Sequence, residues 1–265
     1  MNARSGGAVI SRQIKSPLVR SAYIKNPFRN VILHWRRLRN LQAVRIDGIV
    51  VSTRPEMVVR SVRSALFKST FEAPERHLVA RAVERTDRVL EIGTGTGLVS
   101  LVAARICGPE NMLCYEANPK LQAIIEENYK LNGMTPNLRM KAVTVDGRKV
   151  SFFVDENLLS SSLVDRRSGR KILVPSDPLG AILAEFRPNV LIMDVEGAEV
   201  ELLSRTRLDP INKIIVELHP HIVGEEAVRH LEEHLMDIGF TLFRRQDRTE
   251  HYERVERKPG TLLNE

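Results

Sequence analysis

The sequence predicts an α/β fold of the Rossmann-like type, with a mostly parallel sheet covered by helices on both faces. Three observations support this prediction. Continuously apolar strand patterns alternate with amphipathic helix patterns along the middle of the 265-residue chain, as in a doubly covered parallel sheet. The last two strand patterns follow one another without a helix, which indicates an antiparallel hairpin at the C-terminal edge. Apolar residues make up 43% of the chain, enough for a full core.

Each element follows from its local pattern. Residues 43–53 predict a hairpin that turns at Asp47-Gly48, and residues 55–85 predict helix. Apolar runs predict the core strands, at 88–93, 111–117, 138–143, 189–197 and 211–220. Periodic patterns with Asn, Gly or Pro near their ends predict the helices between them, at 97–108, 118–133, 198–205 and 224–240. Two further hairpins are expected, one over 146–154 with its turn at Asp146-Gly147, and one around Asp247 that joins 240–246 to 251–255.

Positive charge is concentrated at the N-terminus. Residues 1–46 contain ten Lys or Arg and no Asp or Glu, so the rest of the chain carries 30 basic against 33 acidic residues. We therefore expect a basic extension over residues 1–43 and a single domain over 44–265. Within the extension, residues 32–40 predict a short basic helix that contacts an anionic surface such as lipid headgroups or nucleic acid. A solvated tail, or a helix packed on the domain, is the alternative.

The sequence predicts a cytoplasmic protein. It has no apolar stretch of about 18 residues that would span a membrane, and its start lacks the apolar core of a secretory signal. Cys107 and Cys114 lie in apolar patterns whose spacing fits no zinc motif, so we expect two reduced, buried thiols.

The first core strand runs into three alternating glycines. Gly93, Gly95 and Gly97 allow a tight turn and close approach of a ligand, and the free amides of the next helix start there. A dinucleotide loop of the form G-x-G-x-x-G would require glycine at position 98, which is Leu98. The spacing therefore favours a nucleoside ligand without a pyrophosphate over NAD.

Acidic residues follow the second and fourth core strands. Glu116 lies about twenty residues past the glycines, where a carboxylate accepts hydrogen bonds from both ribose hydroxyls of NAD or S-adenosylmethionine alike. Asp194 and Glu196 end the strand over 189–197, and carboxylates so close to an apolar run are costly unless they have a function. Glu199 begins the next helix, where a cap of that helix is the alternative reading.

These motifs, in their order and spacing, resemble the FkbM-type S-adenosylmethionine-dependent methyltransferases. The resemblance covers about residues 75–243, and the segments that carry it are "VLEIGTGTG", "YEANP", "NLLSSSL", "MDVEGAEVELL" and "IIVELHPH". It implies a class I methyltransferase fold with a seven-stranded sheet, and O-methylation of a sugar, a glycan or another small hydroxylated acceptor. The family usually has a lysine two residues before the aspartate of "DVEG", and this chain has Ile192 there.

On this resemblance we assign the site residues. The expected cofactor is S-adenosylmethionine, held by Glu91, Gly93, Thr94, Gly95, Gly97, Glu116, Ala117, Ala142, Val143 and Asp194. The residues expected to take part in catalysis are Asp194, as general base or acceptor-orienting group, with Glu196 and His219. Ser160, Ser161 and Ser162 are expected to form a polar loop that hydrogen-bonds the acceptor.

Other readings remain open at this stage. Asp194, Glu196 and His219 could together bind a magnesium ion that orients a diol, but no spacing demands a metal site and none is expected. A methyltransferase that acts on RNA or protein is one alternative, and the basic extension would deliver that substrate. A non-catalytic S-adenosylmethionine-binding protein is another, supported by Ile192. An NAD oxidoreductase is disfavoured by Leu98.

Overall fold

The computed structural model describes residues 28–154 and 170–255 of the chain. The expected serine loop at 160–162 lies outside the described residues.

The core is a seven-stranded sheet with the strand order β12-β13-β11-β10-β3-β4-β5. Five of its strands are parallel, and β12 and β13 form an antiparallel hairpin at one edge, as expected. The strands are β3 (Val89–Ile92), β4 (Met112–Tyr115), β5 (Leu138–Arg139), β10 (Val190–Met193), β11 (Lys213–Glu217), β12 (Phe240–Gln246) and β13 (Thr249–Arg254). The sheet confirms the predicted fold class, a Rossmann-like class I methyltransferase fold.

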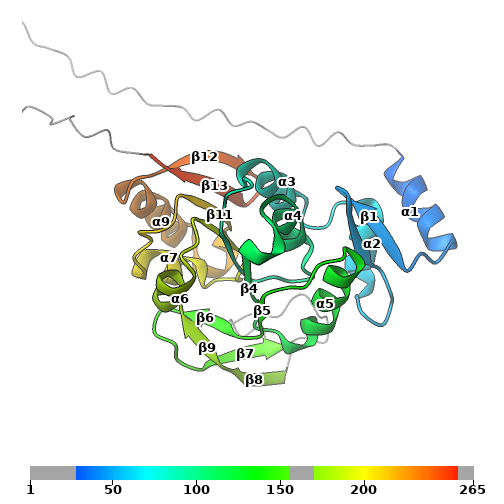
Figure 1. Cartoon of the computed structure of the whole chain (residues 1–265), viewed down its shortest axis with the longest axis horizontal. Coiled ribbons are helices and arrows are strands. Elements are labelled where there is room, and N and C mark those ends of the chain that lie inside the picture. The colour runs from blue at the N-terminus through cyan, green and yellow to red at the C-terminus, as the bar shows by residue number, and fades with distance from the viewer. Residues whose placement is uncertain (1–27, 155–169, 256–265) are drawn as a thin grey trace, which may run out of the picture.

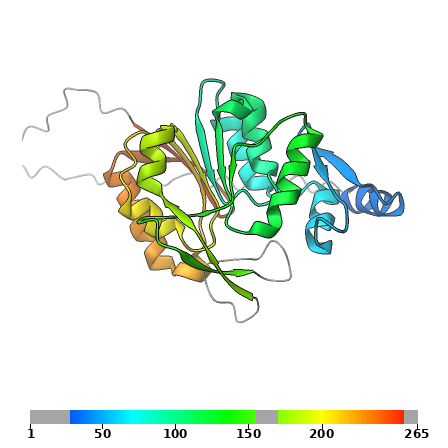
Figure 2. The same cartoon turned by 60° about the horizontal axis from the view of Figure 1, so that its bottom comes forward.

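Helices cover both faces of this sheet (Figures 1 and 2). One face packs against α3 (Ala73–Ala82), α4 (Leu98–Cys107) and α5 (Gln122–Leu131), and the other against α6 (Leu179–Phe186), α7 (Glu199–Arg205) and α9 (Glu225–Asp237). Neighbouring strand residues point to opposite faces. Val89 contributes to the first core and Leu90 to the second, and the same alternation separates Ile192 from Leu191. Burial on both faces explains why the strands are apolar throughout.

The N-terminal part of the described chain packs beside this core. Helix α1 (Arg29–Leu38) is followed by the hairpin of β1 (Ala43–Ile46) and β2 (Ile49–Ser52), and then by α2 (Arg60–Lys68). The hairpin turns at Asp47-Gly48, as expected, because both residues adopt positive φ. Side chains of α5 and of the residue after it fix β2 in place: Val50 N donates to Asn132 Oδ1 (2.9 Å) and Ser52 N to Asn128 Oδ1 (2.7 Å).

The region after β4 differs from the expectation. The predicted strand over 138–143 is broken into β5 and β6 (Ala142–Thr144), and β6 pairs with β9 (Ser176–Pro178). The predicted hairpin over 146–154 does not form, since β7 (Val150–Val154) pairs instead with β8 (Arg170–Val174). Gly147 does turn, with φ of 77°, but its amide is bound by Thr144 Oγ1 and it packs on Pro178. The turn therefore ends β6, and β7 pairs with β8, which lies further along the chain.

Three short helical segments complete the described chain: η1 (Pro109–Asn111), η2 (Pro119–Leu121) and α8 (Pro220–Val223). Within residues 28–154 and 170–255, every helix is too short or too polar to cross a membrane. Cys107 and Cys114 are buried free thiols, as expected.

Candidate functional site

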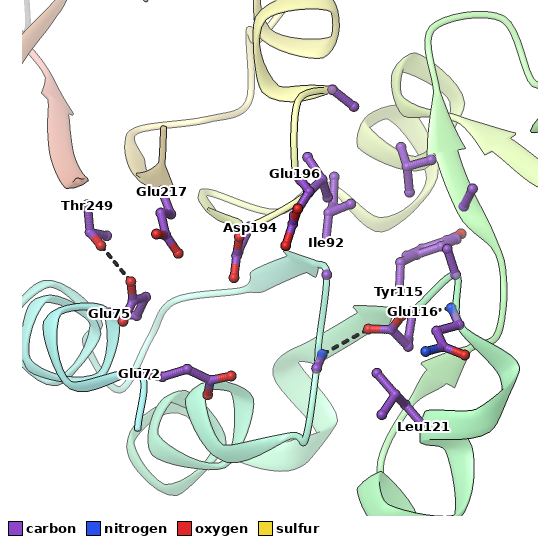
Figure 3. A pocket seen from close by; sticks show the side chains of 18 of the residues that line it. Glu72, Glu75, Ile92, Tyr115, Glu116, Leu121, Asp194, Glu196, Glu217 and Thr249 are labelled. Atoms are coloured by element: carbon purple, nitrogen blue, oxygen red, sulfur yellow. Dashed lines mark hydrogen bonds between the residues drawn. The ribbon is translucent and has the colours of Figure 1, made fainter. Parts of the chain in front are cut away.

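A cavity of about 440 Å³ lies at the carboxyl ends of the parallel strands, where open α/β sheets bind their ligands. Figure 3 shows carboxylate side chains from several elements pointing into it. The apolar part of its lining comes from Phe71, Pro74, Ile92, Tyr115, Leu121, Ala142, Val143 and Val195. The acidic part comes from Glu72, Glu75, Glu116, Asp194, Glu196, Glu217 and Asp247.

The glycine loop between β3 and α4 forms one wall of the cavity. Gly93 has φ of 87°, and a Cβ on it would lie 1.8 Å from the carbonyl oxygen of Asp194. Gly95 has φ of 58°, and its Cβ would lie 3.2 Å from Glu72 Oε1. Side chains at these two positions would strain the backbone and fill the cradle. The loop therefore presents bare backbone at this wall of the cavity.

Glu116 is held with its carboxylate at the cavity, immediately after β4. Its Oε2 accepts the amide N–H of Gly95 at 2.8 Å, and its Oε1 accepts that of Asn118 at 2.7 Å. Burial raises the pKa of Glu116 to about 7, although these amides favour the anion. Each carboxylate oxygen keeps a further lone pair, so the pair can accept two ligand hydroxyls.

Asp194 belongs to a partly buried cluster of ionisable side chains that joins β10, β11 and α7. His219 Nδ1 is hydrogen-bonded to Glu199, whose other oxygen accepts the amide of Gly197 at 2.8 Å. This leaves His219 Nε2 facing Asp194 Oδ1 at 3.7 Å and Glu217 Oε1 at 3.9 Å. Glu199 is fully buried and His219 nearly so. Glu199 therefore fixes the orientation of the imidazole, and the imidazole lies against the two carboxylates that border the cavity.

Two more carboxylates reach the cavity from α3 and the residue before it. Glu72 adopts a left-handed backbone conformation, with φ of 47°, and its Oε2 is buried without a hydrogen-bond partner in the part of the chain described. Glu75 accepts a hydrogen bond from Thr249 Oγ1 at 2.7 Å, which links α3 to the start of β13. In Figure 3, Glu72 and Glu75 face Asp194 and Glu217 across the cavity.

The crowding of these acids shifts their protonation. Burial, with the nearby Glu75 and Asp194, raises the pKa of Glu72 well above its usual range. Burial and Glu217 likewise raise the pKa of Asp194, against the opposing effect of His219. Burial lowers the pKa of His219, but the adjoining carboxylates outweigh it and leave a net increase. The cavity thus has an excess of acidic groups that a cationic ligand would relieve.

The cationic side chains on the cavity wall are already paired. Arg248 Nη2 lies 2.7 Å from Glu217 Oε1, and Lys141 Nζ lies 2.8 Å from Asp177 Oδ1. Seven carboxyl groups and these two cations border the cavity among the described residues. The site is therefore acidic, whereas the chain as a whole has a net charge of +7.

The structure brings most of the predicted site residues to the cavity. Those that border it are Gly93, Gly95, Glu116, Ala117, Ala142, Val143, Asp194 and Glu196. His219 lies behind Asp194 and Glu217 rather than on the wall. Gly97, the residue before α4, has φ of 81° and does not border the cavity.

Glu91 and Thr94 also lie behind the wall. Thr94 Oγ1 donates to the carbonyl of Tyr115 at 3.2 Å, which ties the loop to β4. Glu91 is 1% exposed, its Oε2 is unpartnered among the described residues, and burial raises its pKa to about 8. Both side chains support the loop from inside the protein in this structure.

Sequence reasoning missed part of the site. Glu72, Glu75, Arg248 and Thr249 were not predicted, because their place depends on how α3 and the β12–β13 turn pack. Glu217 was available from the sequence, since it ends a core strand two residues before His219. Asp194, Glu217 and His219 each offer a ligand atom within 4.8 Å of the others, a set that could hold a divalent cation.

Comparison with known proteins finds similarity over parts of the chain. Residues 61–163 match the model of the TRM5/TYW2 methyltransferase domain. The ribosomal protein L11 methyltransferase of Geobacter sp. (strain M21) is 28% identical over 118 residues, 44% of this chain and 38% of that protein. The chain thus matches well under half the length of this curated relative.

Solved structures with a similar course of the chain include TYW2 of M. jannaschii in complex with AdoMet, with a TM-score of 0.42 and 15% identity over 80% of this chain and 86% of that one. Another is the ribosomal protein L11 methylase of Lactobacillus delbrueckii subsp. bulgaricus. Its TM-score is 0.40 and its sequence identity is 15%, and the match covers 68% of this chain and 76% of that one.

The sheet order and the glycine loop are those of the class I methyltransferase fold, and the matched family model and the matched Geobacter protein are both named as methyltransferases. The relatives described above are not of the FkbM type, so the finer resemblance drawn from the motifs finds no support among them.

Proposed function

We propose that this chain is an S-adenosylmethionine-dependent methyltransferase whose acceptor is an amine of a protein. The observation that carries the proposal is the excess of carboxyl groups around a cavity at the strand ends. Such a wall attracts a cationic amine and repels the phosphates of RNA. The named substrate of the matched Geobacter relative is a ribosomal protein, which supports the same choice.

The residues present fit the cofactor. Gly93 and Gly95 leave space at the start of α4, Glu116 presents two oxygens to the ribose hydroxyls, and Ala142 and Val143 offer an apolar wall for the adenine. When bound, S-adenosylmethionine supplies a methyl group carried on a sulfonium cation. The carboxylates of the wall stabilise a cation placed there.

Asp194 and Glu217 are placed to handle the proton of the acceptor. An ammonium group must lose a proton before its lone pair can attack, and a carboxylate of raised pKa takes that proton more readily than an ordinary one. Burial raises the pKa of Asp194 and of Glu217. His219 and Glu199 act behind them as positioning residues, since they hold the orientation of Asp194 without bordering the cavity.

The small hydroxylated acceptor expected from the motifs is the weaker reading. A neutral sugar would bind little more tightly because of the seven carboxyl groups that border the cavity. Neither the matched family nor the Geobacter relative is named for a sugar substrate. A hydroxyl acceptor would use the same Asp194 as its base, so the two readings differ in substrate and share the site.

The experiment is methyl transfer from labelled S-adenosylmethionine to a cell extract divided into protein, RNA and small molecules. We expect label in the protein fraction, stable to ribonuclease, with at least a hundredfold loss in Asp194→Asn. The matched control is Asp237→Asn, an exposed aspartate on α9, which should leave transfer unchanged. Label that ribonuclease releases would assign the enzyme to RNA, and binding of S-adenosylhomocysteine without any transfer would make it a binding protein.

A further inference from the structure

Helix α1 carries an exposed apolar stripe on the face turned away from the protein. Val31, Trp35 and Leu38 are 63%, 51% and 73% exposed, and Phe28, just before the helix, is 65% exposed. Their spacings of three, four and three residues place them along one side of an α-helix. Large apolar side chains gathered in this way on a surface indicate an interaction site.

The opposite face of α1 already has its partner. Ile32 and Leu33 are half-buried, and Leu33 packs against the core beside α2. Arg36 Nη1 donates to the carbonyl of Phe67 at 2.7 Å, which fixes the helix to the end of α2. The helix is thus anchored through one face, while Val31, Trp35 and Leu38 lie exposed on the other.

The segment that carries the stripe is rich in positive charge. Residues 28–71 contain nine Lys or Arg and two acids, Asp47 and Glu56. Asp47 is paired with Arg76, so it adds no free negative charge to this surface. The guanidinium of Arg39 lies over the ring of Trp35, 5.5 Å from its centre. An aromatic residue beside arginine is typical of a helix that lies at a membrane surface.

We propose that α1 is an interfacial helix that lies flat on an anionic lipid surface, with Val31, Trp35 and Leu38 among the acyl chains. The helix spans about 15 Å, too short to cross a bilayer but long enough to lie in the headgroup region. Single-stranded RNA would satisfy the arginines and stack on Trp35, but Val31 and Leu38 offer nothing to a base. The aliphatic half of the stripe therefore selects lipid over RNA.

Trp35 is the only tryptophan of the chain, so its fluorescence reports on α1 alone. We expect vesicles of phosphatidylcholine with about 30% phosphatidylglycerol to shift the emission of the full-length protein to shorter wavelength, and lipids brominated on the acyl chain to quench it. Vesicles of phosphatidylcholine alone should bind more weakly. Binding to the anionic vesicles should weaken in about 0.5 M salt, because the arginines are then screened.

The variant Val31→Ser/Leu38→Ser tests the stripe itself. We expect its partitioning into anionic vesicles to fall at least about tenfold, because two apolar anchors are lost. The matched control is Met236→Ser/Val255→Ser, which removes two similarly exposed apolar side chains (54% and 56%) elsewhere on the surface. Both pairs are largely exposed, and circular dichroism checks that each variant is folded.

Three results would overturn the proposal. One is an unchanged Trp35 emission with anionic vesicles. Another is single-stranded poly(U) binding that displaces the vesicles and survives in the double-serine variant, which would assign the surface to RNA. The third is a shift that grows with protein concentration in the absence of lipid, which would assign the stripe to a second copy of the chain.

Discussion

Replacing Glu91 with glutamine removes a titrating group from the interior of the sheet. The side chain is 1% exposed, and burial raises its pKa to about 8 from an ordinary value of 4.5. The folded protein therefore keeps the proton up to about pH 8, whereas the unfolded chain loses it near pH 4.5. Across this window the folded state binds one more proton, so the free energy of unfolding falls as pH rises.

The size of this effect follows from the pKa difference. Between about pH 5 and about pH 9 the cost of burying Glu91 grows by about 4 kcal/mol. Glutamine has the shape of the protonated acid and cannot ionise, so Glu91→Gln should match the wild type near pH 5 and become the more stable protein at pH 9. Urea unfolding followed by circular dichroism across this range measures the difference.

The control is Glu185→Gln, which removes an exposed carboxyl from α6 and should follow the wild-type curve. If the wild type and Glu91→Gln lose stability in parallel as pH rises, then Glu91 is not the buried neutral acid described above, and the reasoning fails. A variant less stable at every pH would equally count against it, since the carboxyl would then be serving as a bound anion.

Three further predictions concern the cavity. Gly93→Ala should weaken S-adenosylhomocysteine binding at least about tenfold by calorimetry, because its Cβ would lie 1.8 Å from the Asp194 carbonyl; unchanged affinity would refute the close approach. The affinity of the wild type for S-adenosylhomocysteine should weaken as pH falls below about 7, because Glu116 then takes up a proton and accepts hydrogen bonds from hydroxyls less strongly. Glu116→Gln should bind the same ligand about tenfold more weakly, with an affinity that does not change with pH. EDTA should leave methyl transfer unchanged, because Arg248 and His219 already lie against Glu217 and Asp194 where a metal ion would bind. A loss restored by Mg²⁺ would make the cluster a metal site.

The architecture was largely readable from the sequence because its evidence is local. Apolar runs of four or five residues mark the strands, and the rule that ligands bind at the carboxyl ends of strands is enough to find Gly93, Glu116 and Asp194. The pairing of β7 with β8 was not predictable, because it depends on a segment some twenty residues away and not on the turn at Gly147.

The acidic character of the site could not be predicted from the sequence, because it too depends on tertiary packing. Glu72 and Glu75 sit at the start of α3, and only the packing of that helix against β11 and β13 turns them toward the cavity. The cofactor contact predicted for Glu91 stays a prediction, and the structure places its side chain inside the protein. This residue lies in the same motif as the glycines, but strand alternation places its side chain on a buried face of the sheet.

The two asparagines that hold β2, Asn128 in α5 and Asn132 just after it, also block the outer edge of that strand. Asn132 accepts from Val50 N and donates back to the carbonyl of the same residue, and Asn128 accepts from Ser52 N. These are the groups to which the next strand of a sheet would bind, so the side-chain amides take the place of a neighbouring strand. A short two-stranded ribbon beside the domain is thereby prevented from recruiting strands of other molecules, a protection against aggregation that a helix provides without adding a strand.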